Sequence, residues 1–215
     1  EFKKYSNEAQ LYIVSTGQHK EMVNQVLCDF EIQKTYDLQI MTNNQSLAQM
    51  TCKLIKNINS ILDTLNVDYL LVQGDTTTTF SAALSAFYHK VHVAHVEAGL
   101  RTENRYYPYP EEINRRLVTH LASTHFAPTE SAKQNLIKEN IDPHNILVTG
   151  NTVIDALFYI KNKIKLKNDN NKRKILVTTH RRENFGEPLK NICQALHYIS
   201  NNHDDIEIVI PVHLN

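Results

Sequence analysis

The sequence has 215 residues, of which 41% are hydrophobic and 21% are charged, a composition typical of a folded globular protein. Lys and Arg together number 23, as do Asp and Glu, and this neutral balance argues against a dedicated nucleic-acid-binding protein. No apolar run approaches the roughly 18 residues that a membrane span requires, so no membrane partner is expected either.

Residues that commonly bind metals or form disulfides show no ordered spacing. Cys28, Cys52 and Cys193 are dispersed, without a CxxC pair, which predicts buried free thiols in a reducing compartment. The eleven histidines form no HExxH motif and no paired Cys/His spacing. No secretory signal opens the sequence. These features predict a cytoplasmic protein without a bound metal.

Short apolar runs alternate with amphipathic segments over most of the chain. In chain order we expect a strand at 11–15, helices at 19–29 and 45–65, a strand at 69–72, a helix at 80–89, a strand at 91–96, a helix at 111–122, a strand at 124–127, a helix at 129–140, a strand at 146–148 and a helix at 153–163. This alternation predicts an α/β fold with a doubly wound, parallel, Rossmann-like sheet. We expect this first domain to cover residues 1–163.

A charged, Asn-rich segment interrupts the pattern and predicts a linker at 164–173. The pattern then restarts with a strand at 175–178, a helix at 187–200 and a strand at 206–210. One strand–helix–strand unit is too small to bury both faces of a sheet. Residues 174–215 are therefore expected to be the incomplete beginning of a second, nucleotide-binding Rossmann-like domain.

Four polar motifs follow predicted strands: TGQH (16–19), QGDTTTTF (73–80), HVEAGLR (95–101) and HRREN (180–184). In parallel α/β sheets, ligands bind beyond the carboxyl ends of the strands. The shared position of these motifs therefore predicts one site at that edge of the sheet.

Three carboxylates in these motifs are candidates for acid or base chemistry. Asp75 could act in the cleft, or could only cap the following helix. Glu97 at the end of its strand suits general acid or base work, and a salt bridge to Arg101 or Arg105 is the alternative interpretation. Glu111 and Glu112 open a helix after two prolines, and the helix dipole explains one of the two and leaves the other available for a task.

Basic and amide side chains complete the candidate site. His180 could act as an acid or contact a phosphate, and Arg181 suits phosphate recognition, although a solvated basic turn is the simpler interpretation. Gln18, His19 and Gln45 offer neutral donors and acceptors, but each is weak evidence when taken alone.

Taken together, the motifs resemble those of the bacterial, non-hydrolysing UDP-N-acetylglucosamine 2-epimerases. The resemblance runs through TGQHKEM, QGDTTTTF, HVEAGLRT, PEEINR, APTE, VTGNTVIDAL and HRRENFGEP, in order along nearly the whole chain. It implies a GT-B-type architecture of two Rossmann-like domains. It implies interconversion of UDP-GlcNAc and UDP-ManNAc for cell-envelope polysaccharides, by loss and re-addition of UDP through a glycal. It also implies a homodimer that needs no cofactor.

The resemblance also implies roles for individual residues. The catalytic carboxylates of the family correspond to Asp75, Glu97 and Glu111, and its cleft histidine corresponds to His180. Binding of UDP or substrate corresponds to His180 and Arg181. A second UDP-GlcNAc site, which activates the family, corresponds in part to Gln18, His19, Gln45 and Arg181. Asn44 stands where many relatives have Arg.

Two departures from the family bear on activity. Relatives begin with an additional strand and an Arg-containing loop, and they continue well past the PVHLN segment that ends this sequence. We therefore expect a chain truncated at both ends that does not turn over substrate by itself. The alternatives at this point are a hydrolysing 2-epimerase that releases UDP and ManNAc, and a non-catalytic module that binds or senses nucleotide sugars.

Overall fold

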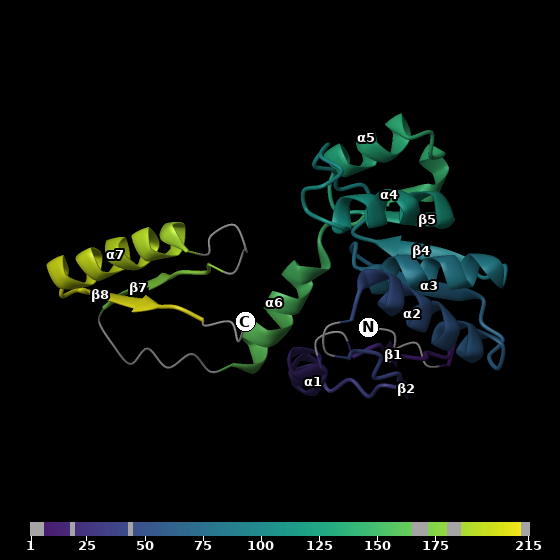
Figure 1. Ribbon diagram of the computed structural model, residues 1–215, viewed down its shortest axis with the longest axis horizontal. Helices are drawn as coiled ribbons and strands as arrows, with labels where there is room; N and C mark the ends of the chain where they lie inside the picture. Colours follow the sequence, from purple (N-terminus) through teal and green to yellow (C-terminus); the bar gives the residue numbers. More distant parts are fainter. Residues whose placement is uncertain (1–6, 18–19, 43–44, 165–171, 180–185, 212–215) are drawn as a thin grey trace. The chain divides into compact units, whose positions relative to one another are not determined.

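A computed structural model describes residues 7–17, 20–42, 45–164, 172–179 and 186–211 of the chain. The chain divides into two compact units, Glu1–Asn162 and Lys163–Asn215 (Figure 1). Most of the predicted linker lies outside the described residues. The mixed α/β class with parallel sheets is confirmed.

The first unit contains a four-stranded parallel sheet in the order β3-β4-β5-β6, and each strand is followed by a helix. Its strands are β3 (Tyr69–Gln73), β4 (His92–Val96), β5 (Thr124–Ala127) and β6 (Ile146–Val148). The following helices are α3 (Thr77–Tyr88), α4 (Glu111–Leu121), α5 (Glu130–Lys138) and α6 (Thr152–Lys163). A 3-10 turn, Pro143–Asn145, precedes β6. Since Gln73 pairs with Val96, the segments after β3 and β4 emerge side by side.

Earlier in the chain, helix α1 (Lys20–Asp29) lies between two short parallel strands, β1 (Val14–Ser15) and β2 (Tyr36–Asp37), and α2 (Leu47–Leu62) follows. The sequence predicted β1 as longer and did not predict β2. A strand of two residues, one of them Asp, offers no alternation of apolar and polar residues from which to recognise it.

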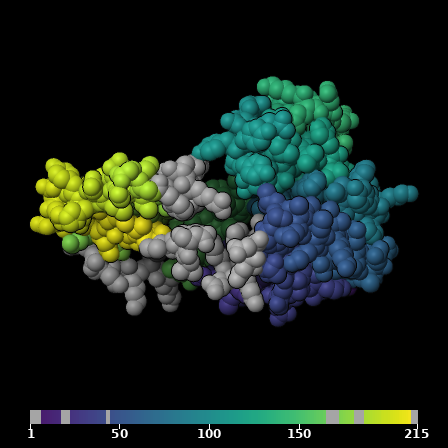
Figure 2. Space-filling view, viewed as in Figure 1, coloured from purple at the N-terminus to yellow at the C-terminus, as the bar shows by residue number. Residues whose placement is uncertain are grey.

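The main core lies between one face of the large sheet and helices α2, α3 and α4. Helix α2 buries an apolar stripe at four-residue intervals, and a capping box between Ser46 and Gln49 fixes its first turn. Helix α3 packs against α2 through small residues such as Ala83 and Ala86, which allow a close approach. The space-filling view shows the outer surface of α2 in blue (Figure 2). The buried stripe of α2 consists of Met50, Leu54, Ile58 and Leu62.

The two faces of the large sheet differ in burial. Paired residues of a parallel sheet point to the same side, and Val72, Val93 and His95 on one side are buried. On the other side, Tyr69 and Leu71 are exposed. The helices in the main core therefore cover one face, and the predicted alternation of strands and helices does not by itself reveal this difference.

Helix α3 begins at Thr77, three residues before the predicted start at 80. The Oγ of Thr76 accepts a hydrogen bond from the backbone N–H of Thr79 at 3.2 Å, so Thr76 is the N-cap. The run of threonines is thus the first turn of the helix. The prediction that this motif caps the helix is confirmed at Thr76, whereas Asp75 stands outside the helix and is not the cap.

A second, smaller core forms where α5 packs against the segment that follows β4. Gly99 lies here with φ +86°, and a Cβ at this position would be 2.2 Å from the carbonyl oxygen of Ala132. No side chain fits at that distance, so only glycine permits the close approach. The predicted N-cap of α5, Thr129, is confirmed, because its Oγ accepts from the N–H of Ala132 at 3.1 Å.

The second unit contains β7 (Arg173–Leu176), α7 (Glu187–Asn202) and β8 (Ile206–Val209), and its two strands pair in parallel. Strand β7 begins and ends two residues before the predicted strand. Among the described residues of this unit, none is fully buried.

The prediction that the cysteines are buried is wrong, because Cys28, Cys52 and Cys193 are all exposed. Cys52 shows the reason, since it lies between Met50 and Leu54 on α2 but two residues off the buried stripe. No helix in the described part of the chain is long and apolar enough to cross a membrane.

Candidate functional site

The site begins at a tight turn after β3. Gly74 has φ +72°, and its N–H donates to the carbonyl of Val96 at 3.0 Å. Its own carbonyl accepts from Nε2 of His95 at 2.8 Å. Thr79 adds a hydrogen bond from its hydroxyl to the carbonyl of Gln73 at 2.8 Å. The turn is therefore fixed by β4 on one side and by its own helix on the other.

Asp75 is held at this turn by two consecutive residues of α4. Nδ2 of Asn114 donates to the carbonyl oxygen of Asp75 at 3.0 Å, and the guanidinium of Arg115 forms an ion pair with its carboxylate. The Asp75 side chain retains 28% of its exposure, so one side of the carboxylate is accessible to a ligand. Neither partner was predicted from the sequence.

Glu97 directly follows β4 and has φ +68°, a left-handed conformation that is unusual for a residue with a long side chain. A Cβ on Gly74 would lie 3.7 Å from Oε2 of Glu97, which places this carboxylate beside the turn that carries Asp75. Within the described residues, no hydrogen bond or ion pair reaches the Glu97 carboxylate. It is a half-buried acid available to a ligand.

The alternative interpretation of Glu97 as a salt-bridge residue is wrong for both proposed partners. Arg101 forms a bidentate pair with Glu139, at 2.7 Å for each of two N–O contacts. The guanidinium of Arg105 lies over the ring of Tyr106, 5.3 Å from its centroid.

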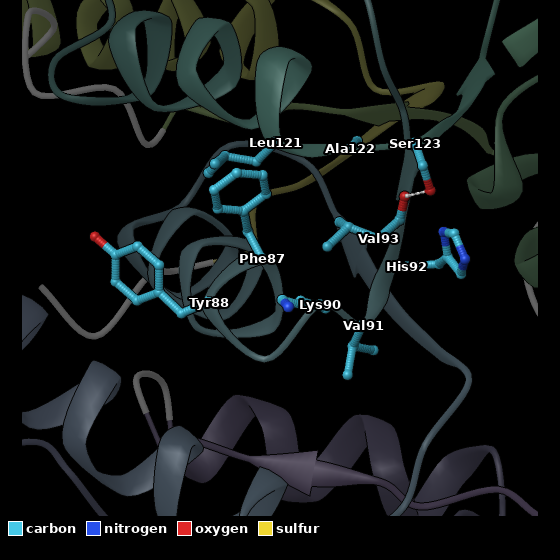
Figure 3. Close-up of a pocket in the computed structure, with 9 residues that line it drawn as sticks. All are labelled: Phe87, Tyr88, Lys90, Val91, His92, Val93, Leu121, Ala122 and Ser123. Carbon is cyan, nitrogen blue, oxygen red and sulfur yellow. Dashed lines mark hydrogen bonds between the residues drawn. The ribbon is translucent and has the colours of Figure 1, made fainter.

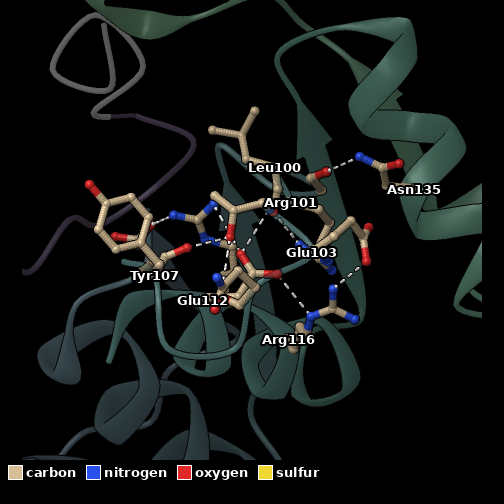
Figure 4. A network of polar contacts seen from close by, with 12 residues as sticks. Leu100, Arg101, Glu103, Tyr107, Glu112, Arg116 and Asn135 are labelled. Atoms are coloured by element: carbon tan, nitrogen blue, oxygen red, sulfur yellow. Dashed lines mark hydrogen bonds and ion pairs between the residues drawn. The ribbon is translucent and has the colours of Figure 1, made fainter. Parts of the chain in front are cut away.

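The two glutamates that open α4 have different surroundings. Glu112 is fully buried: it accepts from the N–H of Thr102 at 3.1 Å and from Nε of Arg116 at 3.0 Å, and its nearest oxygen is 3.5 Å from Arg115 (Figure 4). Burial opposes ionisation, but these donors outweigh it and lower the pKa of Glu112. Glu112 thus joins α4 to the loop that precedes it.

Glu111 makes no such contact within the described part of the chain. It precedes Asn114 by three residues and Arg115 by four, so all three lie on the same side of α4. Because Asn114 and Arg115 both bind Asp75, this side of the helix faces the Gly74–Asp75 turn. Helix α4 therefore presents Glu111 toward the region where Asp75 and Glu97 lie.

A cluster of charged groups fixes the loop between β4 and α4. Arg101 is almost completely buried and also donates to Thr119 at 2.9 Å. Arg116 bridges Glu112, Glu139 and the more exposed Glu103 (Figure 4). The hydrogen bond from Arg101 and the charges of both arginines lower the pKa of Glu139, against the effect of burial. Such a network holds the start of α4, and with it Glu111, in one place.

Of the five remaining predicted site residues, the structure describes only Gln45. His180, Arg181, Gln18 and His19 lie outside the described residues, as does Asn44. Gln45 is described, and its Oε1 accepts from the N–H and the hydroxyl of Thr42 at 3.0 and 2.9 Å. Its observed contacts are local to the turn before α2. In the described residues no group of three or more His, Cys, Asp or Glu is arranged to hold a metal.

A separate hollow of about 540 Å³ lies at the other end of the sheet (Figure 3). It lies beside Val91, His92 and Ser123, which stand at the starts of β4 and β5, whereas Glu97 follows the end of β4. It contains none of the candidate residues. We therefore locate the site from the carboxylates and their contacts, at the carboxyl ends of the strands.

Comparison with known proteins identifies the family. A family model described as UDP-N-acetylglucosamine 2-epimerase matches residues 3–215. The chain belongs to this family. It is 49% identical over 213 residues to the UDP-N-acetylglucosamine 2-epimerase of Yersinia pestis, covering 93% of this chain and 57% of the relative. It is 47% identical over 225 residues to that of Campylobacter jejuni, covering 97% and 59%.

Among solved structures, the UDP-GlcNAc 2-epimerase of Neisseria meningitidis bound to UDP-GlcNAc superposes with a TM-score of 0.89 and 46% identity, over 99% of this chain and 60% of that one. The chain thus spans less than two thirds of each of these relatives. The resemblance inferred from the sequence motifs is confirmed.

Proposed function

We propose that this chain contributes the acid–base half of an enzyme that interconverts UDP-GlcNAc and UDP-ManNAc. The observation that carries the proposal is the convergence of three carboxylates from three segments. Asp75 follows β3, Glu97 follows β4, and Glu111 lies on the side of α4 that binds Asp75. Family membership supplies the substrate, since relatives of this chain carry the name of this activity.

The reaction inverts the configuration at C2 of the sugar. A carboxylate removes the C2 proton, the C1–O bond to UDP breaks, and a C1=C2 double bond forms to give a glycal. UDP then adds back at C1 while an acid delivers a proton to the opposite face of C2. Atoms and electrons balance without an oxidant, so no nicotinamide is required.

Two faces of one carbon require proton carriers in different positions. Asp75, Glu97 and Glu111 are attached to different segments, so they can approach a sugar from different directions. The Arg115 ion pair fixes the direction of the Asp75 carboxylate, while Glu97 and Glu111 have no described partner to compete with substrate. We propose that His180 completes this catalytic set and that His180 and Arg181 contact the UDP group.

The remaining family expectations are part of the same proposal. Gln18, His19, Gln45 and Arg181 are proposed to contribute to a second UDP-GlcNAc site, with UDP-GlcNAc as activator. The protein is proposed to be a cytoplasmic homodimer. Light scattering after gel filtration would test the dimer, and a monomer at micromolar concentration would contradict it.

The test of the reaction is proton exchange at C2. The protein encoded by the complete reading frame that contains this sequence is incubated with UDP-GlcNAc in D2O. The products are followed by NMR. We expect deuterium at C2 and the appearance of UDP-ManNAc, both absent from the Asp75→Asn, Glu97→Gln and Glu111→Gln variants. Binding of UDP-GlcNAc with neither exchange nor UDP-ManNAc would rule out the proposal.

A further inference from the structure

Two histidines lie side by side inside the large sheet. His95 of β4 pairs in register with His125 of β5, and the side chains are 0% and 1% exposed. Nδ1 of each ring is buried without a hydrogen-bond partner among the described residues. Buried polar atoms normally have partners, so this pair requires an explanation.

The two rings differ in what they reach. Nε2 of His95 is 2.8 Å from the carbonyl oxygen of Gly74. A carbonyl can only accept, so Nε2 carries the proton and the neutral ring has a bare Nδ1. Within the described residues His125 makes no hydrogen bond to the turn, although it occupies the same face of the sheet and the same depth.

The surroundings of His95 favour the neutral ring. Burial lowers its pKa, and the charges of Arg101 and Arg115 act in the same direction, against the opposing effects of the Gly74 hydrogen bond and Asp75. A second proton would sit on Nδ1, where the described residues offer no acceptor. The ring therefore keeps one proton, on the nitrogen that faces the turn.

The hydrogen bond connects the two segments that carry acids. His95 lies on the strand that leads directly to Glu97, and its partner Gly74 immediately precedes Asp75. Gly has the least restricted backbone of any residue type, so the peptide groups on either side of Gly74 can rotate unless each of them is held. Its N–H is held by Val96 and its carbonyl by His95.

We propose that His95 is a positioning residue: its imidazole N–H holds the carbonyl of Gly74 and thereby fixes the carboxylate of Asp75 relative to Glu97. His95 does not touch substrate in this arrangement, and its effect passes through the turn. The consequence for turnover rests on the proposed function, whereas the hold on the turn does not.

The activity test compares three variants of the complete reading frame. His95→Gln keeps an N–H near the position of Nε2, His95→Leu removes it, and His125→Leu is the matched control for loss of a buried ring. We expect His95→Leu to lower kcat roughly 10- to 100-fold with KM changed less than about threefold, because small misplacements of reacting groups have effects of this size. His95→Gln should recover most of kcat, and His125→Leu should stay within about twofold. Equal kcat values for His95→Leu and His125→Leu would overturn the proposal.

The structural test uses this 215-residue chain and does not depend on turnover. Only one of its five glycines, Gly74, is followed by Asp, so labelling Gly carbonyl carbon and Asp nitrogen selects a single NMR signal. We expect His95→Leu to shift this signal and His125→Leu to leave it in place. If His95→Leu does not fold, His95→Asn, whose amide is too short to reach Gly74, replaces it. An unmoved signal refutes the hold on the turn. Absence of C2 exchange in the wild type would instead refute the proposed function.

Discussion

Arg115 forms an ion pair with Asp75, a residue 40 positions away in the chain. The pair joins the N-terminal part of α4 to the turn that follows β3, and Asn114 strengthens the same junction through the backbone of Asp75. Two of the proposed catalytic segments are thus fastened to each other before any substrate binds.

Loss of this ion pair should reduce turnover more than stability. In Arg115→Gln, the Asp75 carboxylate loses its charged partner and its fixed direction, and we expect kcat for C2 exchange to fall roughly 100-fold. Arg116→Gln is the control, because Arg116 binds Glu112 and does not touch Asp75. Its kcat should fall much less than that of Arg115→Gln, because Glu112 keeps its contacts with Arg115 and Thr102 and so still holds the start of α4. Similar kcat values in the two variants would show that the Asp75 contact is unimportant.

The two glutamates at the start of α4 should respond in opposite ways to the same substitution. Glu112→Gln breaks a buried charge network and should lower the free energy of unfolding by about 3 kcal/mol. Glu111→Gln removes only a favourable interaction with the helix dipole, a loss below about 1 kcal/mol, but it should abolish C2 exchange. Urea unfolding and deuterium exchange measured on both variants give the comparison. A stable Glu112→Gln protein would contradict the role assigned to the network.

Gly99 and Gly150 provide a matched pair for the effect of close packing. Both have left-handed backbones, with φ +86° and +78°, but a Cβ would collide with the Ala132 carbonyl at Gly99 and would meet nothing within 4 Å at Gly150. Gly150→Ala should therefore lower the free energy of unfolding by about 1 to 2 kcal/mol, the cost of the backbone alone. Gly99→Ala should lower it by at least about 2 kcal/mol more, because backbone must move. Equal losses of unfolding free energy in the two variants would mean that α5 moves away from the new Cβ at no cost.

The buried His125 predicts a loss of stability in mild acid. Burial, followed by the charges of His95, Arg101 and His120, lowers its pKa to about 4, whereas an unfolded histidine titrates near 6.5. Between these two pKa values the unfolded chain binds more protons than the folded chain. The contribution of His125 to the free energy of unfolding is therefore fully present above this window and is lost as the pH decreases through it. The contribution is on the order of 3 kcal/mol. His95 acts in the same direction.

Urea unfolding between pH 7.5 and pH 4.5 measures this effect, and His125→Leu should show a shallower dependence on pH than wild type. His89 supplies the control: the hydrogen bond that its Nε2–H donates to Asp63 raises its pKa, so its contribution is lost above pH 6.5 as the pH rises. His89→Gln should leave the slope below pH 6 unchanged. An identical slope in the wild type and His125→Leu would remove His125 as the cause.

The sequence was sufficient for elements whose pattern is local. Strands β5 and β6 have the predicted bounds, and the N-cap Thr129 lies where a capping hydroxyl was expected. Parallel strands bring their carboxyl ends to one edge, so the neighbouring positions of Asp75 and Glu97 also followed from the pattern.

Contacts that depend on the rotation of a helix could not be read in the same way. The choice between Glu111 and Glu112 is set by which side of α4 faces the sheet, and this is decided by packing over many residues. The spacing of Glu111 to Asn114 and Arg115 contained the relevant information, but nothing local indicated that Asp75 was the partner. The His95 contact was missed because a histidine within an apolar strand also fits an ordinary core position.

The left-handed backbone of Glu97 has a consequence for how the protein could vary. Asn and Gly adopt such a conformation at lower energetic cost than Glu, so the residues that would be least strained at this position lack the carboxylate. Substitutions at position 97 that increase thermal stability would therefore produce inactive proteins. The proposed chemistry implies that Glu97 is retained only by selection for turnover. A homologue with Asn or Gly at this position should be more stable to heat and should have lost the reaction.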